Sequence, residues 1–64
     1  MQVRELAVEC AVGPCPAVFK SGDDLIVVGS VLTAEELKAV THRIKPGEET
    51  AVRIPRSLLV GLKL

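Results

Sequence analysis

The sequence predicts a single small α+β domain, with a β-hairpin, a third strand, one short helix and a C-terminal helical turn. Two apolar, partly β-branched runs flank a Ser-Gly-Asp-Asp turn at residues 21–24, which is typical of a hairpin. A Thr33-Ala-Glu-Glu36 signature then opens a segment with helical spacing. The chain has 64 residues, enough for one domain over residues 1–64. A domain of this size buries only about 60% of its unfolded surface, so it is marginal as a monomer.

Three strands are predicted in the first half of the chain. Residues 3–9 form the first, residues 17–20 the second and residues 25–32 the third. Pro14 and Pro16 keep the segment between the first two out of a central ladder. The run 25–32 is apolar on both faces, so each face needs a cover. We therefore expect a homodimer.

The second half predicts a helix, a strand and a terminal turn. Thr33 and Glu36 form a capping box for a helix over residues 34–42, and Pro46-Gly47 ends it. Residues 49–54 alternate as a further strand. Pro55 opens a helical turn that carries leucines over residues 57–62. The predicted order is β-β-β-α-β-α.

Composition excludes several classes of function. Eight basic and eight acidic residues cancel, which argues against a nonspecific nucleic-acid or membrane-surface binder held by bulk charge. The chain has one Phe and no Tyr or Trp, so it lacks the stacking platform of single-strand binders. Arg4 and Glu5 interrupt the N-terminal apolar residues, and no apolar run approaches the roughly 20 residues of a membrane span. We expect a cytoplasmic protein without membrane contact.

The charges segregate along the chain, from −4 over residues 1–36 to +4 over residues 37–64. The basic part holds the candidate residues for binding DNA or a protein partner, which are Arg43, Lys45, Arg53 and Arg56, with His42 beside them. A strand with outward arginines can contact phosphates or base edges. The same residues also fit an ordinary solvated surface.

Cys10 and Cys15 leave three interpretations open, with His42 as a third candidate for a metal or redox site. The thiols can pack structurally in a Pro-rich bend, form a disulfide or redox pair, or bind zinc. A structural zinc site needs four protein ligands, and one chain offers three residues of these types. Catalysis by a Cys–His pair also requires an orienting acid and an oxyanion hole. We expect neither a cofactor nor an enzyme.

Several segments together resemble a known pattern: Cys-Pro-Ala-Val-Phe at residues 15–19, Val-Val-Gly at 27–29, Pro-Gly-Glu at 46–48 and Ile-Pro with Leu-Leu at 54–59. This pattern is similar to a small actinobacterial family that is associated with helix-turn-helix regulators. The resemblance implies a role in regulation and assigns no activity. The chain has Phe19 where the family commonly has Tyr.

Residues 50–62 also resemble the strand-proline-helix segment of AbrB-type swapped-hairpin transcription factors, which are obligate dimers. That resemblance implies DNA contacts through Arg53 and Arg56. From all these observations we expect a non-enzymatic binding module, an accessory to a transcriptional regulator. The alternatives are a dimeric AbrB-like DNA-binding protein and a thiol switch or zinc site at Cys10 and Cys15.

Overall fold

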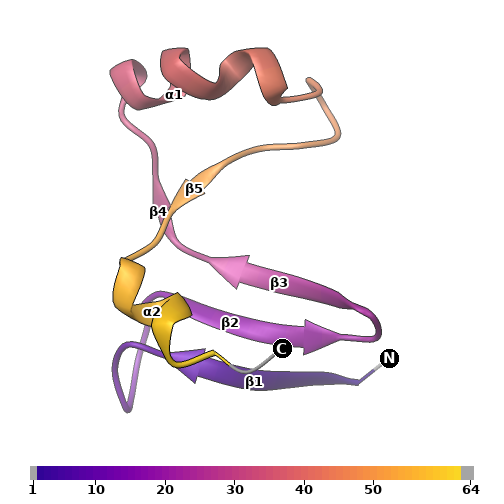
Figure 1. Ribbon diagram of the computed structural model, residues 1–64, viewed down its shortest axis with the longest axis vertical. Helices are drawn as coiled ribbons and strands as arrows, with labels where there is room; N and C mark the ends of the chain where they lie inside the picture. Colours follow the sequence, from indigo (N-terminus) through magenta and orange to yellow (C-terminus); the bar gives the residue numbers. More distant parts are fainter. Residues whose placement is uncertain (1, 63–64) are drawn as a thin grey trace.

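The computed structural model describes residues 2–62 and contains a three-stranded antiparallel sheet in the order β1-β2-β3. The strands are β1 (Val3–Val8), β2 (Ala17–Ser21) and β3 (Asp24–Val28). They lie in the lower half of Figure 1, with β2 in the middle. The three predicted strands are therefore present, and β1 and β3 are the two edges of the sheet.

The β2–β3 hairpin is closed by a tight turn. Ser21 lies opposite Asp24, so only Gly22 and Asp23 form the loop. Gly22 has a φ of 62°, in the left-handed region that glycine adopts without steric cost. A two-residue loop with glycine in its first position matches the twist of an antiparallel pair, which fixes the register of the whole hairpin.

The predicted strand over residues 25–32 is broken at Gly29. Residues before it belong to β3, whereas β4 (Ser30–Val31) pairs with β5 (Val52–Arg53) in a separate two-stranded ladder. A Cβ at Gly29 would lie 2.5 Å from the carbonyl oxygen of Arg53 and 2.7 Å from Cγ2 of Ile54. The absence of a side chain lets the two chain segments cross at this point, and the crossing ends β3.

The helix α1 (Ala34–Val40) follows β4 and continues into a 3₁₀ turn, η1 (Thr41–Arg43). Its capping box is formed: the Glu36 amide donates to Thr33 Oγ1 at 3.2 Å, and the Thr33 amide donates to Glu36 Oε1 at 2.9 Å. The prediction of residues 34–42 thus covers α1 and most of η1. The prediction of a strand over residues 49–54 was too long, since β5 pairs only along the two residues of β4.

The small core lies where the helix α2 (Arg56–Val60) meets the sheet. Ala17, Val18 and Leu58 are the buried hydrophobic residues of the described chain. Ser57 Oγ donates to Glu9 Oε1 at 2.7 Å, which ties the start of α2 to the end of β1. The α+β fold is confirmed, including a short C-terminal helix after Pro55.

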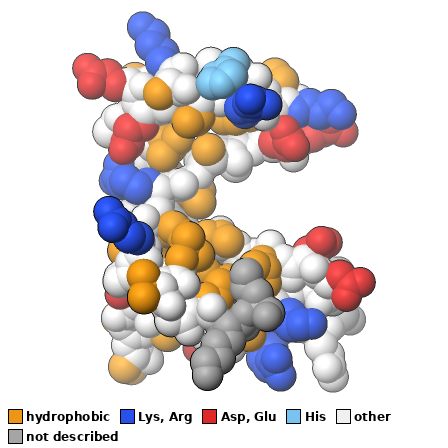
Figure 2. All heavy atoms as spheres, viewed as in Figure 1, with side chains coloured by type: hydrophobic (Ala, Val, Ile, Leu, Met, Phe, Trp, Pro, Cys, Tyr) orange, Lys and Arg blue, Asp and Glu red, His pale blue; other side chains and the backbone are white. Residues whose placement is uncertain are grey.

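The molecule has an open, C-like shape (Figures 1 and 2). An arm, made of β4, α1, η1, the following loop and β5 (residues 30–53), stands away from the sheet and joins it near Gly29 and Ile54. The Cα radius of gyration is 13.0 Å, against about 10.7 Å for a compact chain of this length. We call the space between the arm and β3 the notch.

Candidate binding surface

The sheet presents an apolar strand at its open edge. Leu25, Ile26, Val27 and Val28 of β3 keep between 39% and 46% of their surface exposed. Successive residues of a strand point to opposite faces, so both faces of β3 are uncovered. β3 is also the sheet strand nearest the arm, and its edge borders the notch (Figure 1).

The arm presents apolar side chains of its own. Leu37 and Val40 lie three residues apart in α1, hence on one helix face, and both are exposed. Val31 of β4 and Val52 of β5, a directly opposed pair, are exposed as well. Figure 2 shows apolar side chains on the arm side and on the sheet side of the notch. The notch is therefore an apolar surface with an unpaired strand edge on one wall.

The structure distributes the predicted basic residues instead of gathering them. Arg43 belongs to η1 and Lys45 to the loop after it, whereas Arg53 lies in β5 and Arg56 begins α2. Lys45 Nζ forms an ion pair with Glu48 Oε2 at 3.0 Å. The predicted basic residues are thus spread over the arm and α2.

Arg53 is held by an acidic partner within the arm. Its Nη1 donates to Glu36 Oε1 at 2.6 Å, the same oxygen that accepts from the Thr33 amide. The Thr33 amide, and then Arg53, hold the pKa of the Glu36 carboxyl below its ordinary value. Glu36 therefore joins the N-terminus of α1 to β5.

Cys10 and Cys15 form a disulfide in the β1–β2 loop, with their Cα atoms 6.2 Å apart. Of the three interpretations, the structure favours the disulfide. His42 lies in η1, in the arm, far from the β1–β2 loop at the foot of the sheet (Figure 1). The described residues 2–62 contain no group of three or more His, Cys, Asp or Glu side chains placed to hold a metal ion.

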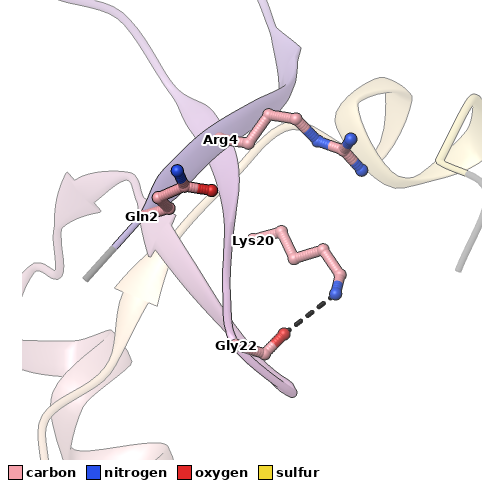
Figure 3. A pocket seen from close by; sticks show the side chains of 4 residues that line it. All are labelled: Gln2, Arg4, Lys20 and Gly22. Carbon is pink, nitrogen blue, oxygen red and sulfur yellow. Dashed lines mark hydrogen bonds between the residues drawn. The ribbon is translucent and has the colours of Figure 1, made fainter.

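Sequence reasoning missed a small cationic hollow on the sheet (Figure 3). Arg4 of β1 and Lys20 of β2 are directly opposed in the ladder, and Gln2 and Gly22 complete the lining. Lys20 Nζ donates to the carbonyl oxygen of Gly22 at 2.9 Å. Two cations side by side on a strand pair repel each other. Their proximity depends on the β1–β2 register, which no local pattern in the sequence reveals.

No helix within residues 2–62 is long and apolar enough to cross a membrane. No protein-family model, curated protein or solved structure matches the chain.

Proposed function

We propose that this protein is a non-enzymatic protein-binding module that serves as an accessory to a transcriptional regulator. The observation that carries the proposal is the imbalance between its core and its surface. Three hydrophobic residues are buried among the described ones, while thirteen large hydrophobic residues are exposed. Eight of these thirteen belong to β3, β4, α1 and β5, the elements around the notch. An exposed apolar patch of this kind on a small domain marks a site of protein contact.

The site chemistry supports a binding role over a catalytic one. Both sulfurs are joined in the disulfide, so neither Cys10 nor Cys15 is available as a thiolate nucleophile. His42 lies in the arm, away from both. The regulator as partner class comes from the sequence resemblance, and the apolar notch supplies a surface suited to protein contact.

Affinity capture from the native host, followed by identification of the captured proteins, tests this proposal. We expect the wild-type chain to retain a protein with a DNA-binding domain, and a Leu37→Asp/Val40→Asp variant to lose it. Leu59→Asp/Val60→Asp is the matched control, because both residues are exposed on α2 rather than on the arm. Recovery of the chain alone, or equal capture by both variants, would contradict the proposal.

Direct DNA binding through Arg53 and Arg56 is the alternative. Its weakness is that Glu36 already neutralises Arg53 at 2.6 Å. We expect the protein alone to give no mobility shift on duplex DNA. A shift that Arg53→Ala/Arg56→Ala abolishes would replace our proposal with this alternative.

A thiol switch at the disulfide is the second alternative. A dithiol reductant would transfer two electrons and two protons to Cys10 and Cys15, leaving two free thiols. Because the disulfide lies in the β1–β2 loop and not at the notch, we expect partner capture to persist after reduction. Loss of capture on reduction, restored by reoxidation, would establish the switch.

A further inference from the structure

The two edges of the sheet differ in their protection. β1 carries an extra residue, Leu6, between the paired positions Glu5 and Ala7, and it bears the exposed charges of Arg4 and Glu5. Bulges and charges on an edge strand discourage further pairing. β3 pairs without interruption from Asp24 to Val28 and has no charge beyond Asp24. The β3 edge is therefore the one that is available to pair with another strand.

The direction of the main-chain groups of β3 follows from one hydrogen bond. The Glu9 amide donates to the Pro16 carbonyl at 3.0 Å, so the main-chain carbonyl of Pro16 points toward β1. The main-chain groups of successive residues in a strand point to opposite edges, so those of Ala17 and Phe19 point toward β3. Their partners Val28 and Ile26 therefore point back to β2.

It follows that the N–H and C=O groups of Leu25 and Val27 point away from β2, toward the open edge. Each non-proline residue has one donor and one acceptor on its main chain, and burial of either without a partner is costly. Any protein that covers the apolar side chains of β3 must therefore also satisfy these groups. A strand does both.

The surface area indicates how large the missing contact is. The chain exposes 5464 Å², whereas a compact monomer of its mass of 6.8 kDa exposes about 3,950 Å². The excess is about 1,500 Å² per chain. Two chains that buried this excess against each other would bury about 3,000 Å², within the 2,000–5,000 Å² typical of obligate dimers.

We propose that the occupant of the notch is a second copy of this chain, whose β3 pairs antiparallel with β3 to make a continuous six-stranded sheet. On the two-fold axis, Ile26 lies opposite Ile26 of the partner subunit. Leu25 then lies opposite Val27 of the partner subunit, and their outward main-chain groups bond in both directions. Asp24 faces Val28 of the partner subunit, so no like charges meet.

In this dimer, the arm would cover the β3 strand of the partner subunit. The partner's β3 lies beside the edge that borders the notch, where Leu37 and Val40 of α1 are available to cover it. The inference rests on the proposed function in one respect, that the notch is a protein-binding surface. The regulator would then bind the assembled dimer, so Leu37→Asp/Val40→Asp would lose the regulator because it loses the dimer.

Cysteine trapping tests the geometry through a gain of signal. In an antiparallel pair whose main-chain groups point away from each other, opposed Cβ atoms are close enough for a disulfide. We expect Ile26→Cys to form a covalent dimer under mild oxidation, while Val60→Cys, exposed on α2, does not. A wild-type dimer in which Ile26→Cys crosslinks no better than Val60→Cys would overturn the β3 pairing.

Native mass spectrometry of the wild type and of Val27→Pro tests the dimer itself. Proline at residue 27 removes an N–H that β2 does not use, so the hairpin keeps its ladder while the new pairing is blocked. We expect a dimer for the wild type and a loss of dimer for the variant. A wild-type monomer overturns this inference: if it still captures a regulator, the proposed function stands, and if it captures nothing, both fail.

Discussion

The two edge strands of the sheet differ in how well they are protected against pairing with a further strand: β1 is protected and β3 is not. On β1, Leu6 distorts the pairing and Arg4 and Glu5 carry charge. On β3, the pairing is regular and four consecutive residues are apolar and exposed. Since natural proteins protect edges that must stay free, an unprotected edge indicates one that is used. The difference between the two edges, more than either edge alone, locates the binding surface.

The largest expected effect is on the assembly state, when β1 is changed into an unprotected edge strand like β3. Deletion of Leu6 together with Arg4→Val and Glu5→Val removes the bulge and the charges. A dimer joined through β3 would then have two open β1 edges, so we expect open-ended assemblies that scatter light and sediment rapidly. The same two valine substitutions with Leu6 retained are the control. If the full variant stays dimeric, the protection of β1 has another cause.

Loss of the disulfide is expected to lower the stability of the fold through the β1–β2 loop, while the pairing through β3 is retained. Cys10 and Cys15 are separated by 5 positions, and closing so short a loop stabilises the fold by about 2 kcal/mol. For a domain of this size, that loss lowers Tm by about 15 °C. Calorimetry of Cys10→Ala/Cys15→Ala measures it, and native mass spectrometry should still find the dimer. A dimer lost with the disulfide would mean that the two edges are not independent.

The capping box stabilises the arm above β3, and its removal is expected to have a smaller effect. Thr33→Ala removes the acceptor of the Glu36 amide and costs about 1 kcal/mol of helix stability. Denaturant unfolding followed by circular dichroism measures the change, with Thr41→Ala, at the far end of α1, as control. Equal losses for the two variants would show that the cap is not the source.

The smallest expected effect is a dependence on pH through Glu36. Its pKa is lowered in the folded chain by the Thr33 amide and by Arg53. The folded form thus keeps the carboxylate more readily than the unfolded form, so this stabilisation is present above the ordinary pKa of a glutamate. It is lost as the pH falls through the lowered pKa. Tm measured across this acidic range should fall less steeply for Glu36→Gln, and parallel curves would exclude the contribution.

The local elements of the fold were predictable because their causes are local. Thr33 and Glu36 are three residues apart and form the capping box that they predict. Gly22 supplies the left-handed residue of the hairpin turn. The end of β3 at Gly29 was missed because its cause is distant in sequence: the carbonyl of Arg53 crosses there. A glycine inside an apolar strand was the one available signal.

The candidate site was predictable only in part for the same reason. The apolar run 25–32 already indicated a strand that needs a cover, and the structure leaves Leu25 and Val28 exposed. Which acidic residue pairs with each basic residue depends on the tertiary structure, so the Arg53–Glu36 ion pair could not be predicted from sequence spacing. The cysteine spacing was compatible with three chemistries, and it took the loop geometry to bring Cys10 and Cys15 together.

Amide hydrogen exchange of the wild-type protein tests the pairing of β3 most directly. The account predicts that the Leu25 and Val27 amides, which point away from β2, are protected as strongly as the Ile26 and Val28 amides that bond to it. Alternating protection along β3, with slow exchange at Ile26 and Val28 and fast exchange at Leu25 and Val27, would show an edge open to water and contradict the account.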